Sequence, residues 1–224
     1  MEQNSEVWLD YRRGKITGSK NKDVRPLSRG ADRTPQGVWK LVAERLAVAP
    51  DGEKEMDRGH RCESDAIARL VDVIDKPFET DAGIWVSETS EDVMLSPDAS
   101  APYLDDKLDV PTYAAEIKCL NSDNHLKYIY KDKLARINNK DLYNPIDSVP
   151  KEYRDQALGY FAINPKLETL YFCFFDDRLS EPSLEFHYLE IKREHIAEEA
   201  EALTAMQNQT LKFVDDIIEF LTED

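Results

Sequence analysis

The sequence predicts an α/β fold, with a central mixed sheet flanked by helices. Two observations carry this prediction: apolar residues recur at helical spacing before residue 76 and again towards the C-terminus, and short segments of strand character lie between. A length of 224 residues suits one domain. We therefore expect a single domain over residues 1–224, with an acidic helical region at its C-terminal end.

Two helices are expected in the first third of the chain. Residues 36–48 place four apolar side chains on one helical face. Residues 55–75 repeat apolar side chains at helical spacing as well, and Pro77 follows as a stop signal.

The middle of the chain then changes from helical to strand-like patterns. Residues 83–87 and 92–95 are expected to form a strand pair joined by a polar turn. Three further strands are expected, over residues 113–120, 169–175 and 184–191. Helices are expected over residues 152–163, ended by Asn164-Pro165, and over about 195–221. Residues 121–144 are expected to be part helix and part loop.

Charge is distributed unevenly along the chain. The net charge of −16 argues against a protein that coats nucleic acid through a basic surface. Residues 12–33, however, hold eight basic and two acidic residues, whereas residues 176–224 hold fourteen acidic and four basic ones. This pattern predicts one anion-binding face and one solvated acidic face, although a charged loop beside an exposed helix would have the same composition.

Composition also bears on where the protein works. No apolar run approaches the roughly 18 residues that a membrane span requires, and the first residues lack the regions of a signal peptide. The three cysteines are widely spaced and imply neither a disulfide framework nor a zinc site. A reducing cytoplasm is the expected location.

Two strand segments carry residues suited to metal-dependent chemistry. Asp98 follows Pro97 at the end of one strand, and Glu116 and Lys118 lie two residues apart in another, so the latter pair shares a face. Such charged groups in an apolar strand are costly to desolvate unless they are paired or bind a ligand. Two carboxylates would offer Mg²⁺ the oxygens that it prefers. Lys118 would orient or deprotonate water, or stabilise charge on a phosphate; an exposed ion pair is the alternative.

Two residues on expected helices extend this candidate site. Glu63 follows Gly59 and precedes the apolar face of its helix, where it would add a third carboxylate. Gln156 lies beside Tyr153 and Tyr160 on the helix of residues 152–163. This combination favours a reactive site over an ordinary ion pair on the sheet surface.

Six motifs occur along the chain in a fixed order: Trp8-x-x-x-Arg12, Gly14-Lys15-Ile16-Thr17-Gly18-Ser19, Arg58-Gly59-x-x-x-Glu63, Ser96-Pro97-Asp98, Glu116-x-Lys118 and Gln156. This ordered set resembles the YqaJ/lambda-exonuclease family of viral recombinases, within the PD-(D/E)XK nuclease superfamily. The resemblance covers residue 8 to about residue 188 and implies a restriction-endonuclease-like sheet. It implies that Asp98, Glu116 and the main-chain carbonyl of Ile117 bind metal. It further implies that Lys118 is the catalytic lysine, with Glu63 and Gln156 in the same site.

The same resemblance implies recognition of DNA ends. Arg12 would contact a terminal 5′-phosphate, with Ser19 nearby, and an arginine fork matches phosphate geometry well. Trp8 is interpreted as a core anchor. Met56 occupies the place of an apolar wedge that separates the terminal base pair, although the two residues after it depart from the family pattern.

The resemblance implies a Mg²⁺-dependent exonuclease that degrades one strand of linear double-stranded DNA from 5′ to 3′ and leaves a 3′ single-stranded tail. It implies two Mg²⁺ ions per site, replaceable by Mn²⁺, a homotrimeric ring around DNA, and a single-strand annealing protein as partner. One alternative is a restriction-like endonuclease of the same fold, which would need no 5′-end pocket at Arg12 and Ser19. The other is a catalytically silent DNA-end-binding module, which would be expected to lose Asp98, Glu116 or Lys118.

Overall fold

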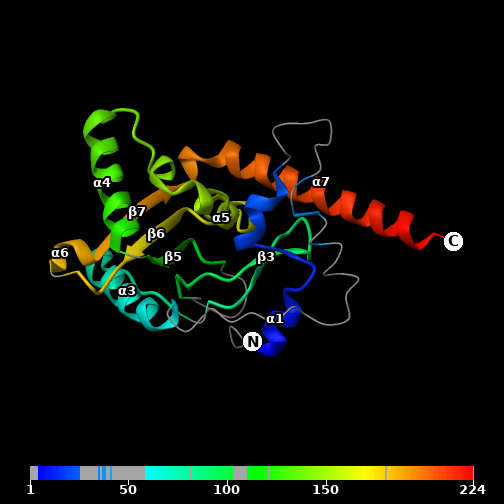
Figure 1. Cartoon of the computed structure of the whole chain (residues 1–224), viewed down its shortest axis with the longest axis horizontal. Helices are drawn as coiled ribbons and strands as arrows, with labels where there is room; N and C mark the ends of the chain where they lie inside the picture. The colour runs from blue at the N-terminus through cyan, green and yellow to red at the C-terminus, as the bar shows by residue number, and fades with distance from the viewer. Residues whose placement is uncertain are drawn as a thin grey trace.

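The computed structural model describes residues 5–25, 35, 37–38, 41, 59–80, 82–102, 110–120, 122–179 and 181–223. Its mixed sheets flanked by helices confirm the α/β prediction (Figure 1). The first half contains α1 (Glu6–Tyr11), β1 (Ile16–Thr17), the 3-10 helix η1 (Gly18–Val24), α3 (Gly59–Ile74), β2 (Trp85–Val86), β3 (Val93–Leu95), β4 (Ala99–Ser100) and β5 (Tyr113–Cys119). The second half contains α4 (Ser122–Asn138), η2 (Pro145–Ser148), α5 (Lys151–Ile163), β6 (Thr169–Phe175), α6 (Pro182–Glu185), β7 (Phe186–Lys192), η3 (Arg193–His195) and α7 (Ala197–Thr222).

Within the described residues the strands form two sheets. The larger sheet has the order β4-β5-β6-β7, in which β5 and β6 are parallel and the other neighbours antiparallel. The smaller sheet has the order β1-β3-β2, with β1 parallel to β3 and β2 antiparallel to it. The chain passes from β3 in the small sheet to β4 in the large one through Ser96-Pro97-Asp98, so Asp98 lies where the two sheets meet.

Helices cover both faces of the large sheet. One face of β5 and β6 packs against α3, through a cluster that includes Ile117 and Cys173 with Ile67 and Leu70. The opposite face packs against α5 and α7, in a larger cluster with Phe172 and Phe174 among its members. Alternation along the strands produces this division, because neighbouring side chains point to opposite faces.

The helix η1 lies unusually close to α5. A Cβ atom built on Gly159 of α5 would come within 1.9 Å of the Asn21 side-chain nitrogen, so any larger residue here would require Asn21 to move. Asn21 is fully buried and accepts a hydrogen bond of 2.6 Å from Gln207 of α7. These contacts fix the segment after β1 against α5, which carries part of the candidate site.

Most of the elements expected from the sequence are present. The strand over 169–175 is confirmed in full, and the helix over 152–163 begins one residue earlier, at Lys151. The strand expected over 184–191 begins at Phe186, because Pro182 starts a short helix that includes Leu184. The helix expected over 36–48 lies almost entirely outside the described residues. Among the helices that the structure describes, none has the length and apolar character that crossing a membrane requires.

Candidate active site

Glu116 and Lys118 share one face of β5, as the alternation in the sequence predicts, and this face points towards α5. Their side chains form an ion pair, in which the Lys118 ammonium donates to Oε1 of Glu116. Glu116 is only 3% exposed. The Lys118 ammonium also lies 5.0 Å from the centre of the Tyr153 ring, which favours its charged form. The alternative of an exposed surface ion pair is therefore wrong for Glu116, whose carboxyl group lies inside the protein.

Two side chains of α5 complete the surroundings of Glu116. Gln156 donates from Nε2 to Oε1 of Glu116 at 2.6 Å, and the hydroxyl of Tyr160 donates to Oε2. Tyr160 is fully buried, and Trp85 of β2 packs against its ring edge-on at 6.0 Å. Both Glu116 oxygens are thus held by hydrogen bonds, which lowers the cost of burying this charge and fixes its direction.

The register of β4 and β5 brings Asp98 next to Glu116. Ala99 pairs with Ala115 in an antiparallel ladder, so the residue before Ala99 and the residue after Ala115 lie opposite each other. The backbone N–H of Ile117 donates to Oδ2 of Asp98 at 2.6 Å. Asp98 therefore lies beside the middle of β5. Its carboxyl group accepts from a backbone N–H that would otherwise continue the hydrogen-bond ladder between β4 and β5.

The electrostatics of Asp98 indicate a site suited to a cation. Burial, together with the negative charges of Glu116 and then Glu63, raises the pKa of Asp98 well above its ordinary value, against the opposing effect of Lys118. Glu63 on α3 thus acts on the same carboxyl as Glu116 does from β5. Three carboxylates that repel one another in a partly desolvated space are stabilised by a bound cation.

These residues fit a Mg²⁺ ion of the kind expected from the sequence. Asp98 and Glu116 would supply carboxylate oxygens. Two further oxygens could come from the main-chain carbonyl of Ile117, which follows Glu116 in the chain, and from Glu63, whose charge acts on Asp98. In the described part of the structure, no three side chains of His, Cys, Asp and Glu form a complete metal-binding group. Water and phosphate oxygens would therefore complete the coordination, which is the usual arrangement for Mg²⁺.

Lys118 keeps its proton in this environment. Burial acts to lower the pKa of its ammonium, but Glu116 and Asp98 outweigh that effect, so the pKa is raised overall. At neutral pH Lys118 is therefore a cation, suited to orienting a water or stabilising charge on a phosphate.

The Gly14–Ser19 motif is placed at the same edge of the protein as Asp98. Strands β1 and β3 are parallel, so their carboxyl ends lead to Gly18-Ser19 and to Ser96-Pro97-Asp98 side by side. A Cβ built on Gly18 would lie 3.7 Å from the Gln156 side chain and 3.1 Å from that of Leu95. Gly18 therefore lies beside Gln156, which donates to Glu116, so Ser19 follows in the neighbourhood of the carboxylates.

Arg12 is placed by a different contact. It follows α1, and its guanidinium lies over the Trp8 ring at 4.0 Å from the ring centre. Trp8 is 5% exposed, in keeping with its interpretation as a core anchor. An arginine guanidinium carries a planar fork of N–H groups whose geometry matches a phosphate.

The rest of the basic segment is only partly consistent with an anion-binding surface. Arg25 forms a two-pronged ion pair with Asp155 of α5, with Nε at 2.6 Å from Oδ2, so its charge is balanced within the protein. Arg29 and Arg33 lie outside the described residues, as does Met56, the expected wedge.

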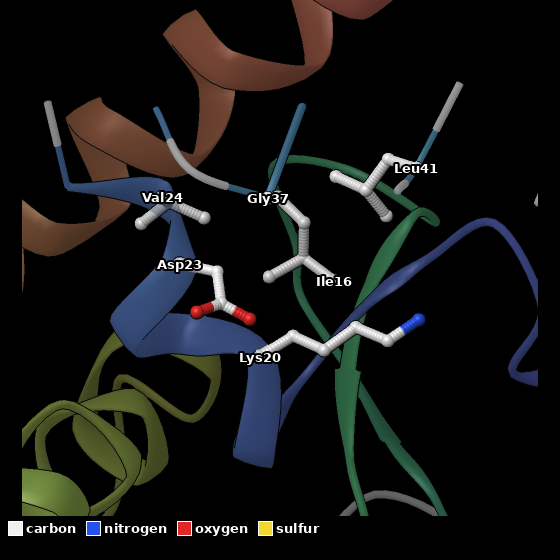
Figure 2. Close-up of a pocket in the computed structure, with 6 residues that line it drawn as sticks. All are labelled: Ile16, Lys20, Asp23, Val24, Gly37 and Leu41. Carbon is white, nitrogen blue, oxygen red and sulfur yellow. The ribbon is translucent and has the colours of Figure 1, made fainter. Parts of the chain in front are cut away.

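A small hollow beside this segment lies apart from the carboxylates. Figure 2 shows it between η1, β1 and the segment of Gly37, with Ile16, Val24 and Leu41 forming its walls. Its lining is largely apolar, and the Lys20 ammonium points away from its centre (Figure 2). This hollow therefore offers mostly apolar contacts, unlike the carboxylate cluster.

The sequence prediction did not assign a role to Tyr160 or Tyr153. Both contact charged site residues, Tyr160 through its hydroxyl and Tyr153 through its ring. Their spacing from Gln156, four residues after and three residues before, places all three on one helical face. That spacing is the signal from which a shared role could have been inferred.

Replacing Asp98 with asparagine is expected to stabilise the metal-free protein. Because the folded-state pKa of Asp98 is raised, the stability that its protonated form contributes is fully present below the ordinary pKa of 3.8 and is lost as pH rises through the folded pKa. An asparagine side chain at this position stays neutral and can still accept from the Ile117 N–H. With EDTA at pH 7, we expect the melting temperature of the variant to be a few degrees higher. In a chain of this length, each kcal/mol of added stability raises the melting temperature by roughly 2–4 °C.

Melting curves with and without Mg²⁺ check this prediction. Mg²⁺ should raise the melting temperature of the natural protein, because a ligand that binds only the folded state stabilises it. That rise should be much smaller for Asp98→Asn and unchanged for Asp72→Asn, an exposed carboxylate on α3. An equal rise for the Asp98 variant would contradict metal binding here.

Comparisons with known proteins give the family and the fold of this chain. The model of the YqaJ-like viral recombinase domain matches residues 7–167. The structure is similar to that of an alkaline exonuclease (LHK-Exo) from Laribacter hongkongensis, with a TM-score of 0.72 and 24% identity over 97% of this chain and 96% of that chain. It is also similar to LHK-Exo in complex with dAMP, with a TM-score of 0.68 and 23% identity over 97% and 98% of the two chains. A search of curated proteins gave no match.

Proposed function

Since the chain belongs to the YqaJ-like viral recombinase domain family, we propose that it is a Mg²⁺-dependent exonuclease that hydrolyses one strand of linear double-stranded DNA. The observation that carries the proposal is the buried Glu116 carboxylate, held by Lys118, Gln156 and Tyr160 next to Asp98. A structural ion pair alone would not require a second and third carboxylate beside it. The likeness to an alkaline exonuclease supports the same reaction class.

The roles of the side chains follow from their contacts. Asp98 and Glu116 would hold the metal, with the Ile117 carbonyl and Glu63 beside it. When bound, Mg²⁺ would supply Lewis-acid chemistry that activates water and stabilises the leaving oxygen. Lys118, as a cation, would stabilise charge on the phosphate, and Gln156 would keep Glu116 in position or contact the attacked phosphate.

The direction of digestion depends on how the enzyme holds a DNA end. We propose that Arg12 and Ser19 bind a terminal 5′-phosphate and that cleavage runs from 5′ to 3′, leaving a 3′ single-stranded tail. The packing of Gly18 on Gln156 supports this proposal, because it joins the Ser19 segment to the carboxylate cluster.

The proposed assembly and setting follow from the same family. We propose a homotrimeric ring around duplex DNA, with a single-strand annealing protein that takes up the 3′ tail, in the cytoplasm of a bacterium or a phage-infected host. A ring would confine the attraction for phosphates to its interior, which suits a chain with a net charge of −16.

One digestion experiment tests the reaction and its direction. Linear duplexes labelled at the 5′ or the 3′ end, and a covalently closed circle of the same sequence, are incubated with the enzyme in Mg²⁺ or in EDTA. We expect early release of the 5′ label, retention of the 3′ label, an intact circle and no reaction in EDTA. Cutting of the closed circle would instead favour a restriction-like endonuclease, and binding of ends without cleavage would favour a silent module.

A further inference from the structure

Helix α4 presents an apolar stripe to solvent. Its inner side is buried, with Ile129 and the polar residues His125 and Asp132 facing the protein. Four exposed apolar side chains run along the outer side at spacings of four, four and three residues: Leu126, Tyr130, Leu134 and Ile137. Ile137 is 69% exposed. Residues at this spacing lie on one helical face, so they form a continuous ridge, the α4 stripe.

The end of α7 carries a second set of exposed apolar side chains. The buried residues of this helix end at Val214, and Phe213, Phe220 and Leu221 are exposed. Phe220 is 77% exposed. Figure 1 shows that this last part of α7 extends beyond the body of the protein. We refer to residues 213–223 as the α7 end.

The two surfaces carry opposite charge. Lys127, Lys131 and Lys133 are exposed beside the α4 stripe. The α7 end carries exposed acidic residues and no basic one: Asp215, Asp216, Glu219 and Glu223. In a chain whose net charge is −16, such an acidic segment is repelled by most of its own surface and attracted to a basic one.

The positions of the two surfaces decide how copies can meet. In Figure 1 helix α4, which carries the α4 stripe, and the α7 end lie towards opposite ends of the long axis. One chain therefore cannot join them to each other. Contacts between unlike surfaces of identical chains are heterologous, and they give a ring if the rotation closes.

We propose that the α7 end of one copy docks on the α4 stripe of the next copy, head to tail. The apolar side chains fill the centre of this contact, and the lysines of α4 surround it opposite the carboxylates of α7. A surface for a DNA backbone would not place leucine and isoleucine along its middle, whereas a protein interface does. The contact itself is inferred from these two surfaces, and only the number of copies that it joins rests on the ring in the proposed function.

Mixing two defective variants tests the head-to-tail arrangement. Variant one carries Tyr130→Asp and Ile137→Asp on α4; variant two carries Phe220→Asp and Leu221→Asp on α7. All four side chains are exposed, and they lie on two helices that carry none of the candidate active-site residues, so folding and cleavage of a short duplex should persist. By sedimentation velocity at micromolar concentration, each variant alone should be a monomer of 25.8 kDa. Their mixture should form a particle of two copies, because variant one keeps the α7 end and variant two keeps the α4 stripe.

The matched control is Val73→Asp, which charges an exposed apolar side chain of α3 and should leave the assembly of the natural protein unchanged. The proposal is overturned if either double variant keeps the full assembly, or if the mixture stays monomeric. It is also overturned if the α4 variant loses DNA binding but still sediments with the mass of the natural assembly. A natural protein that is monomeric yet cleaves DNA would overturn this proposal and the ring, while the proposed hydrolysis would stand.

Discussion

Replacing Lys118 with alanine is expected to reduce DNA cleavage by about 10²–10⁴-fold. Lys118 is the cation that contacts Glu116, and its raised pKa keeps it charged at neutral pH. Its removal takes away the positive charge that would stabilise the phosphate in the transition state. The variant leaves the carboxylates of Asp98 and Glu116 in place, so it should still bind metal.

Two measurements on the same variant separate chemistry from metal binding. The cleavage rate at saturating Mg²⁺ should fall, while the rise in melting temperature on adding Mg²⁺ should persist. Lys166→Ala removes an exposed lysine from the turn after α5 and should leave both quantities unchanged. A fully active Lys118→Ala variant with unchanged metal dependence would exclude Lys118 from the reaction.

The part of the site that could be predicted from the sequence depends on local geometry. Glu116 and Lys118 are two residues apart in a strand, and a period of two places them together in any strand. The strand itself was expected over residues 113–120 and is observed as Tyr113–Cys119. Asp98 was expected at the tip of the preceding strand, and the position of Pro97 was enough to indicate it.

The hydrogen bonds of Tyr160 and Gln156 to Glu116 depend on how α5 packs on the sheet. Helical spacing shows that the two side chains share a face, but not which strand that face meets. In the structure, the close approach of η1 at Gly159 and the contacts with α7 set the position of α5. These contacts join residues far apart in the chain, so a single sequence could not predict them.

Short elements were missed for a different reason. Strands β1 and β4 contain two residues each, too few for an alternating pattern to be recognised. They nevertheless decide the arrangement of the site. The pairing of β1 with β3 brings Gly18-Ser19 to the same edge of the small sheet as Asp98, and the pairing of β4 with β5 places Asp98 beside Glu116. The motif in residues 14–19 indicated function where the strand pattern indicated nothing.

Replacing Arg12 with alanine is expected to slow digestion of a 5′-phosphorylated duplex far more than digestion of the same duplex with a 5′-hydroxyl. A hydrogen bond between charged groups contributes roughly 1.5–3 kcal/mol, which corresponds to a loss of about tenfold to a hundredfold. The guanidinium over Trp8 is held in one orientation, so its loss removes a positioned contact and not a mobile charge.

Comparing the two substrates on one variant makes the test independent of folding. A variant that is partly unfolded would lose activity on both duplexes equally, so the ratio of the two rates reports the phosphate contact alone. Arg12→Lys should fall between the natural protein and the alanine variant, because an ammonium keeps the charge but lacks the fork of N–H groups. Lys22→Ala, an exposed change in the same basic segment, should leave the ratio unchanged. Equal slowing of both substrates by Arg12→Ala would show that this arginine does not bind the 5′-phosphate.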